Sequence, residues 1–205
     1  MEAAEGGETG DEVGQMNDLE DKESREFAAR KGAFDKWLES TLGFSFGTFD
    51  EGRNDWTIAI RLHAMIETAL NHMLTTHFKI PELAEVFAKM DTSDMKRGKL
   101  AFVMRLKLLP REHIEFIQKF SELRNFLVHN AGNFKLKLTE YPSKIKGGQG
   151  WIKLLARLGA KHIGDKQGED AAIRFVEKTA MPTLRFVCFL ILEHIFRSSG
   201  AYLPS

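Results

Sequence analysis

The chain has 205 residues, with 29 basic and 29 acidic side chains and a formal net charge of zero at pH 7. This length fits one domain with a tail, and it is enough to bury a core without disulfides. The single cysteine, Cys188, excludes a disulfide framework and a zinc site built from several cysteines. A net charge of zero disfavours a nucleic-acid partner only where the charge is evenly spread.

The charge is not evenly spread along the chain. Residues 1–31 carry ten acidic and four basic side chains, a net charge of −6, so the remaining 174 residues carry +6. The first twenty residues hold four glycines and no aromatic residue. Such a segment buries too little apolar surface to offset its ordering entropy. We therefore expect a disordered acidic tail over 1–21 and a single, mildly basic helical domain over 22–205.

Helical periodicity dominates the first half of the domain. Residues 22–42 form an amphipathic stretch that ends near Gly43. Asn54 or Asp55 can cap the next helix, which we expect over 55–78. A short helix after Pro81 and another over 94–108 follow. Pro110 then suits the first turn of a helix over 111–130.

The second half contains the least regular segment. Residues 134–141 alternate between apolar and polar side chains, which predicts a short strand or an extended arm. A glycine cluster breaks this segment before a short helix over 151–159. A long helix over 169–198, bent at Pro182, closes the chain. With so little predicted strand, the fold class is an all-α bundle. No apolar run is long enough to span a bilayer, so we expect a cytoplasmic protein with no membrane contact.

The helix over 111–130 carries an arginine among apolar residues. At 100° per residue, Arg124 falls about 20° from Ile117, within the apolar stripe of this helix. Asn125 and His129 fall on the border of the stripe. A guanidinium keeps its charge, so in a buried position it needs a carboxylate, a ligand anion or a partner subunit. The alternative is a structural arginine whose stem packs while its head forms a salt bridge or reaches water.

The six residues from Arg124 to His129, RNFLVH, resemble the R-polar-x3-H signature of the HEPN superfamily. The preceding stretch over 98–110 is similar to the helix before this motif in HEPN-type proteins, including those similar to the mannitol operon repressor. The resemblance covers about residues 55–132. It implies a HEPN-like helical bundle in which residues 133–168 form an irregular basic insertion.

The resemblance also implies an activity. Many members are metal-independent endoribonucleases that cleave single-stranded RNA through its 2′-hydroxyl, without a cofactor. Arg124 is then expected to contact the scissile phosphate, His129 to move a proton, and Asn125 to orient the histidine or the phosphate. HEPN-type proteins typically dimerise, so a homodimer is expected. A toxin–antitoxin or defence role, with an antitoxin or other protein partner, is typical of the superfamily.

Two other interpretations stay open. Relatives similar to the mannitol operon repressor share the bundle without evident nuclease chemistry, which suggests a non-catalytic regulator or interaction module. His129 then simply lies at the C-terminus of its helix, where the helix dipole favours a cation. A third option is a structural bundle in which Arg124 belongs to a buried ion pair.

A basic stretch follows the motif helix. Its lysines, interspersed with Phe134, Tyr141 and Trp151, suit single-stranded RNA, because phosphates pair with lysine and bases stack on aromatic rings. The alternative is a solvated loop. The predicted RNA contacts are Lys135, Lys137, Lys144, Lys146 and Lys153. The glycines at 147–150 lack the ending of a nucleotide-binding loop, and the histidines at 63, 72 and 77 lack metal-ligand spacing, so neither site is expected.

Overall fold

The computed structural model describes residues 9–43, 54–146, 148–163 and 168–200, and this part of the chain is entirely helical and irregular, with no strand. The all-α prediction is therefore confirmed. The α-helices in chain order are α1 (Thr9–Leu42), α2 (Asp55–Phe78), α3 (Leu83–Lys89), α4 (Lys99–Arg105), α5 (Arg111–His129), α6 (Tyr141–Lys144), α7 (Gly148–Ile163), α8 (Glu169–Lys178) and α9 (Ala180–Ser198). Two short 3-10 helices, η2 (Ala131–Lys135) and η3 (Leu138–Glu140), lie between α5 and α6.

Local signals set the ends of α2 and α5. The side chain of Asn54 accepts a hydrogen bond from the Thr57 backbone N–H at 2.9 Å, so Asn54 is the N-cap of α2. Lys79 ends this helix in the left-handed region, with φ 56°. Pro110 precedes the first residue of α5, where its missing N–H leaves no unpaired donor. These boundaries match the expected ones to within one residue.

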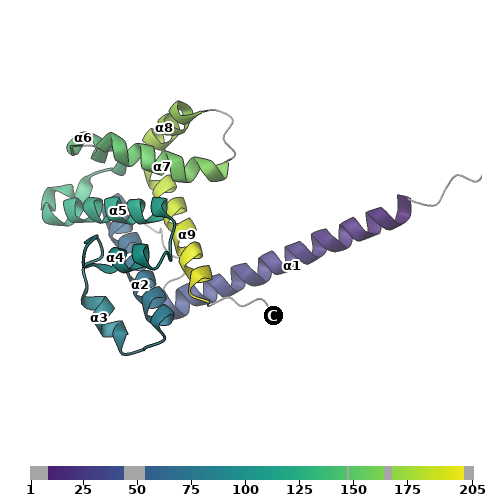
Figure 1. Ribbon diagram of the computed structural model, residues 1–205. Coiled ribbons are helices and arrows are strands. Elements are labelled where there is room, and N and C mark those ends of the chain that lie inside the picture. The colour runs from purple at the N-terminus through teal and green to yellow at the C-terminus, as the bar shows by residue number, and fades with distance from the viewer. Residues whose placement is uncertain (1–8, 44–53, 147, 164–167, 201–205) are drawn as a thin grey trace, which may run out of the picture.

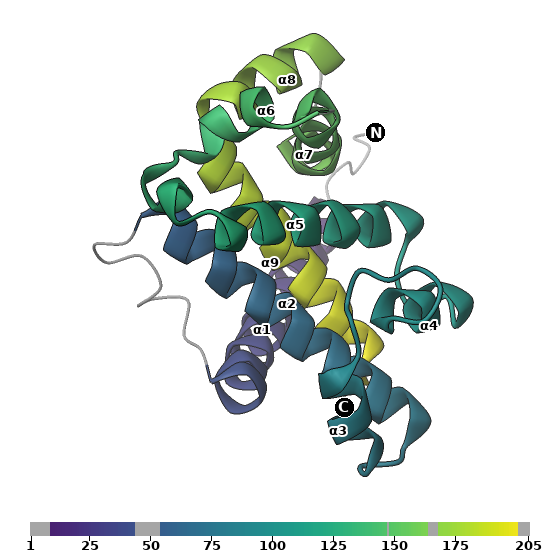
Figure 2. The ribbon, with the colours of Figure 1, turned by 90° about the vertical axis from the view of Figure 1, so that its left-hand side faces the viewer.

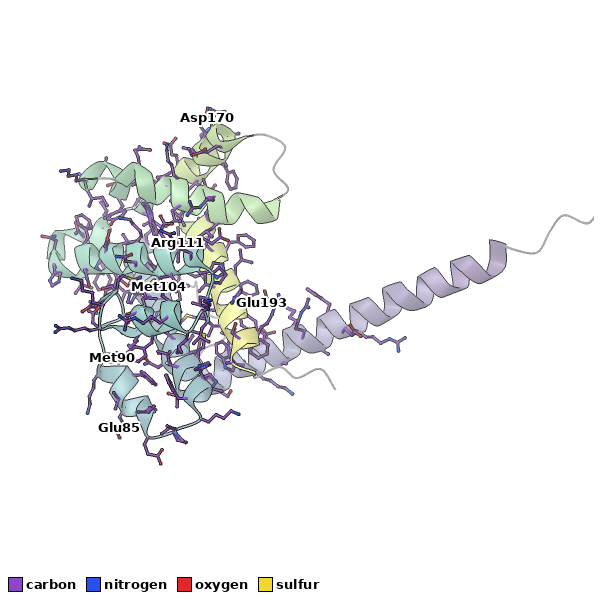
Figure 3. The ribbon with its side chains drawn as sticks, viewed as in Figure 1. Glu85, Met90, Met104, Arg111, Asp170 and Glu193 are labelled. Atoms are coloured by element: carbon purple, nitrogen blue, oxygen red, sulfur yellow. The ribbon has the colours of Figure 1, made fainter. Side chains whose placement is uncertain are left out.

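The core lies between α2, α5, α7 and α9. Helices α2 and α9 run side by side, and α5 crosses them (Figure 2). Helix α9 is buried along most of its length, and the thiol of Cys188 within it is fully buried. Burial raises the pKa of this thiol well above its usual value, so Cys188 is an inert core residue. Helices α3 and α8 lie at opposite ends of the bundle, as the labels on Glu85 and Asp170 indicate (Figure 3).

Helix α1 is longer than expected. It begins at Thr9, and its first half projects away from the bundle (Figure 1). Its last turns are held by aromatic contacts: the ring of Phe34 lies 5.3 Å from that of Phe189 and 5.4 Å from that of Phe196. Residues 9–21, expected in a disordered tail, take helical backbone in the structure. Residues 1–8 lie outside the described residues, so disorder there stays a prediction.

The region expected as an irregular insertion is built into the core instead. The predicted strand or extended arm at 134–141 is wrong, because this segment forms η2 and η3. Leu138 and Tyr141 are buried three residues apart, which is the period of a 3-10 helix. The next helix, α7, begins at Gly148, three residues before the predicted start. A Cβ on Gly148 would lie 2.1 Å from the carbonyl O of Pro142, so this glycine lets the backbones of α6 and α7 meet closely.

The last predicted helix is broken in two. Helices α8 and α9 meet at Thr179 at an angle of 109°, three residues before the predicted bend at Pro182. Pro182 instead occupies the first turn of α9, where a proline costs little. No single helix in the described segments is long and apolar enough to cross a membrane, although α8 and α9 together pass that test by length and composition.

Candidate functional site

The motif occupies the second half of α5, where this helix crosses α2 (Figure 2). Two hydrogen bonds join the helices on either side of Arg124. On one side, His63 Nε2 lies 2.9 Å from Ser121 Oγ. On the other, Trp56 Nε1 donates to the carbonyl O of Leu127 at 2.9 Å. We call the line formed by these four residues and Arg124 the α2–α5 seam.

Arg124 lies at the border of the buried face. Its neighbours Leu123 and Leu127 are buried, Arg124 is half-buried and Val128 is 43% exposed. The face of α5 that α2, α4, α7 and η2 cover therefore has Arg124 at its edge and not within it. Arg124 Nη1 donates to Asn125 Oδ1 at 3.0 Å. Among the described residues no carboxylate forms an ion pair with Arg124.

The other two motif residues are exposed. Asn125 accepts its hydrogen bond from Arg124, so it orients the arginine in this structure, and among the described residues it makes no hydrogen bond with the histidine. His129 is the last residue of α5, and its ring bonds to no other described side chain. Arg124 and His129 are five positions apart, or about 7.5 Å of helical rise. Arg124 and Asn125 are thus coupled, and His129 stands alone at the helix end.

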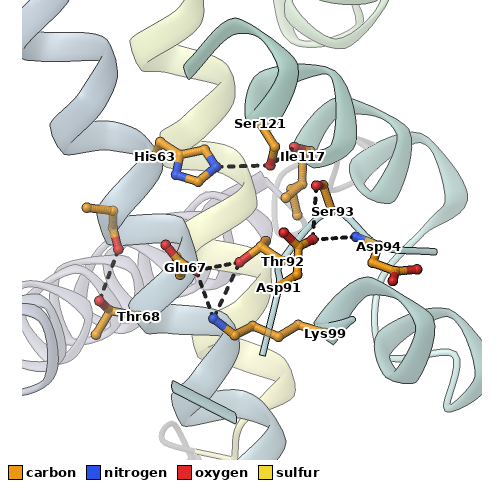
Figure 4. Close-up of polar contacts among 11 residues, drawn as sticks. His63, Glu67, Thr68, Asp91, Thr92, Ser93, Asp94, Lys99, Ile117 and Ser121 are labelled. Atoms are coloured by element: carbon orange, nitrogen blue, oxygen red, sulfur yellow. Dashed lines mark hydrogen bonds and ion pairs between the residues drawn. The ribbon is translucent and has the colours of Figure 1, made fainter. Parts of the chain in front are cut away.

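A buried polar cluster lies beside the seam (Figure 4). Lys99 is fully buried, and its Nζ lies 2.8 Å from Glu67 Oε1 and 3.4 Å from Thr92 Oγ1. Thr92 Oγ1 also donates to Glu67 Oε1, at 2.6 Å. This cluster was not among the predicted sites. Glu67 follows His63 by four residues, so both lie on one face of α2. This spacing of two polar side chains was the sequence feature that could have indicated the cluster.

Burial determines the protonation of His63. Burial lowers its pKa to about 4, against the attraction of Glu67, which raises it, and with the help of the positive charges of Arg124 and Lys99. The ring is therefore neutral at physiological pH. Ser121 Oγ also donates to the carbonyl O of Ile117 at 2.9 Å, and a hydroxyl has one proton. When that proton is used there, Nε2–H of His63 is the donor to Ser121.

The predicted lysines are all exposed, but two of the predicted stacking residues are not. Lys135, Lys137, Lys144, Lys146 and Lys153 lie on η2, α6 and α7 or next to them. Trp151 is 1% exposed and Tyr141 is 2% exposed, so the prediction that they stack on bases is wrong. Both rings fill the core instead: the Trp151 ring lies 5.6 Å from Phe116 and 6.2 Å from Phe120.

The lysines divide into groups at different places. Lys135 and Lys137 follow the motif directly, and η2 contacts both α2 and α5. Lys153 shares an exposed face of α7 with Arg157, whose Nη2 lies 2.9 Å from Glu115 in the first half of α5. Glu115 precedes Arg124 by nine residues, about 13 Å of helical rise. Lys153 therefore lies toward the far half of α5, away from the motif.

The turn after α5 is fixed to α2. Asn54 Nδ2 donates to the carbonyl O of Phe134 at 3.1 Å, and Asp55 Oδ2 accepts from the Leu138 backbone N–H at 2.8 Å. Asn133 Nδ2 donates to the carbonyl O of Phe126 at 2.8 Å. These three bonds hold η2 against the C-terminal end of α5 and the N-terminus of α2.

Metal ligands do not gather in the described segments, where no three His, Cys, Asp or Glu side chains converge. His72 packs its ring 5.9 Å from that of Trp37, and burial lowers its pKa. His77 lies exposed in the last turn of α2. The histidines at 63, 72 and 77 are therefore in three different environments.

Comparisons with known proteins leave the family open, because no family model, curated protein or solved structure matches the chain. The HEPN resemblance accordingly stays a prediction that rests on the motif residues and their helix.

Proposed function

We propose that the protein is a metal-independent endoribonuclease of the HEPN type that acts on single-stranded RNA. One observation carries the proposal: the half-buried Arg124 has no carboxylate partner among the described residues, and it is bonded to the exposed Asn125, with the exposed His129 five residues further along the same helix. A cation held partly out of water and left unpaired attracts an anion, and the phosphodiester of RNA is such an anion.

The residues then divide the reaction between them. Arg124, oriented by Asn125, binds the non-bridging oxygens of the scissile phosphate and stabilises the charge that develops there. The 2′-hydroxyl of the preceding ribose attacks phosphorus and gives up its proton, and the bond to the 5′-oxygen breaks as that oxygen gains a proton. His129 accepts the first proton or supplies the second, as an imidazole does near neutral pH. The products are a 2′,3′-cyclic phosphate and a 5′-hydroxyl.

The proposal includes a homodimer. One His129 serves one proton transfer, while the reaction needs two, and a second copy of the chain supplies another histidine. The exposed Val128, which lies between the motif residues, offers apolar surface for such a contact. The lysines that follow the motif, Lys135 and Lys137, supply charge for the flanking phosphates.

The decisive experiment is incubation of labelled single-stranded RNA with the full chain in EDTA. Wild type is compared with Arg124→Ala and His129→Ala. Arg111→Ala and His77→Ala are the matched controls, because both residues are exposed and Arg111 begins α5 at the end opposite the motif (Figure 3). We expect the two motif variants to lose cleavage by about 100-fold or more while the controls keep it. Cleavage that survives both motif substitutions contradicts the proposal.

The second candidate is a non-catalytic regulator or interaction module with the same bundle. The observation that favours it is the isolation of His129, whose ring is oriented by no described side chain. Under this alternative no form of the chain cleaves the RNA, and a separate binding measurement shows RNA or protein binding that depends on Arg124.

A further inference from the structure

Phe134 is an exposed aromatic residue on a fixed turn. Its side chain is 51% exposed, although the carbonyl O of the same residue accepts a hydrogen bond from Asn54. The turn is held on both sides of Phe134, through Asn133 to α5 and through Leu138 to α2. A ring presented to solvent by a fixed backbone loses little freedom when a ligand stacks on it.

A second ring lies beneath the first. The centroid of the Phe134 ring lies 5.6 Å from that of Trp56, in a tilted arrangement. Trp56 is itself half-buried, and its indole N–H is occupied by the carbonyl O of Leu127, within the motif. The indole thus fixes Phe134 in place and connects it to the turn of α5 that carries Asn125 and His129.

Positive charge flanks the exposed ring. Lys135 and Lys137 are both exposed, and the segment 133–138 has no acidic residue. In the wider segment 133–146, four lysines stand against one acid, Glu140. Exposed aromatic rings with lysines alongside are the usual elements of a single-stranded nucleic-acid site, because bases stack on the rings and phosphates pair with the lysines.

We propose that Phe134, supported by Trp56, is a base-stacking platform that holds one nucleobase of single-stranded RNA beside the motif. Lys135 and Lys137 contact the phosphates on either side of that base. The platform replaces the stacking role first expected of Tyr141 and Trp151, which are buried. The platform rests on the proposed function for the identity of its ligand, and it adds the place where the RNA strand approaches the motif.

The test measures binding and cleavage separately. A fluorescent oligonucleotide with 2′-O-methyl sugars cannot be cleaved through its 2′-oxygen, so its anisotropy reports binding alone. Wild type is compared with Phe134→Ala, with Phe134→Tyr, which keeps a stacking ring, and with Phe175→Ala. Phe175 is the matched control, since it is 50% exposed and lies on α8.

Stacking of one base predicts that Phe134→Ala weakens binding by about 5- to 150-fold. Phe134→Tyr and Phe175→Ala are expected to bind as wild type does. On an abasic oligonucleotide, wild type and Phe134→Ala are expected to bind equally, because no base is present to stack. Lys135→Ala is expected to reduce the salt dependence of binding by about one phosphate contact, whereas Phe134→Ala leaves it unchanged.

The outcomes separate this proposal from the nuclease. Base-dependent loss in Phe134→Ala without cleavage by wild type supports the platform and overturns the nuclease. Cleavage by wild type with an unchanged KM in Phe134→Ala overturns the platform and leaves the nuclease. A loss that persists on the abasic strand, or a change in oligomeric state in Phe134→Ala, assigns the ring to packing or to a second copy of the chain and overturns the platform. No binding by wild type overturns both.

Discussion

The buried ammonium of Lys99 allows the cost of removing its partner to be predicted, as a change in the free energy of unfolding. Lys99 is fully buried, and its partner Glu67 has a side chain that is 36% exposed. Removing one partner of a buried pair costs about 3–5 kcal/mol, because the other charge is left unpaired. We expect Glu67→Ala to lower the free energy of unfolding by about 3 kcal/mol, the lower end of that range, because the Glu67 side chain already reaches solvent and Thr92 remains as an acceptor for Lys99.

The reverse substitution is expected to be mild. Lys99→Met removes the buried charge and keeps most of the volume of the stem, so it should cost less than about 1.5 kcal/mol. Glu67 then keeps the hydrogen bond from Thr92 and its contact with water. In the double variant, Lys99→Met should recover most of the loss caused by Glu67→Ala, because no ammonium is left to pair.

Urea unfolding at neutral pH, followed by far-UV circular dichroism, measures these free energies. The control is the exposed pair Lys119 and Glu122, whose charged atoms lie 3.2 Å apart. Removing the side chain of Lys119 or of Glu122 is expected to lower the free energy of unfolding by less than about 1 kcal/mol. A Glu67→Ala variant no less stable than Lys99→Met would refute the reasoning, since the ammonium would then have found water or another acceptor.

Two further predictions concern the core. Burial lowers the pKa of His63 to about 4, so the unfolded chain binds a proton at this histidine more readily than the folded chain does. The free energy of unfolding should therefore fall by about 3 kcal/mol as the pH drops from about 6.5 to about 4. Urea unfolding across this range should show a flatter dependence on pH for His63→Gln and the wild-type dependence for the exposed His77→Gln. Trp151→Ala should lower the free energy of unfolding by about 3–5 kcal/mol, because it removes a buried indole between Phe116 and Phe120. Lys153→Ala, two residues further along α7 and exposed, should change stability by less than about 0.5 kcal/mol in the same assay.

The sequence predicts best where a local signal sets the structure. Helix α2 begins and ends at the predicted residues because Asn54 provides the cap and the apolar residues repeat with the helical period. The break between α8 and α9 was misplaced because Pro182 does not cause it. Thr179 leaves the helical backbone region and donates its hydroxyl to the carbonyl O of Phe175, four residues earlier, at 2.7 Å, and a proline three residues later does not reveal this turn.

The prediction for the segment after the motif was wrong for a different physical reason. Its alternating pattern and lysines are typical of a solvated arm, and period-two alternation is hard to tell from a 3-10 period over so few residues. The sequence contains no local sign that Tyr141 meets Phe126 at 5.3 Å or that Trp151 enters the core. Only the packing of α7 against α5 decides that the aromatics turn inward while the lysines stay outside.

The candidate site is best understood through the carboxylates that surround it. On α5, Glu122 pairs with Lys119 and Glu115 pairs with Arg157. On α2, Glu67 pairs with Lys99, and Asp55 accepts from the backbone of Leu138.

Each of these acids is therefore engaged by another group. Arg124, which lies between the two helices, is left with the amide oxygen of Asn125 as its hydrogen-bond acceptor among the described residues. A neutral acceptor does not compensate a guanidinium as a carboxylate does, so we expect the site to bind an anion from outside the chain. This distribution of partners, which the helical wheel alone did not reveal, is the physical reason for expecting a phosphate at Arg124.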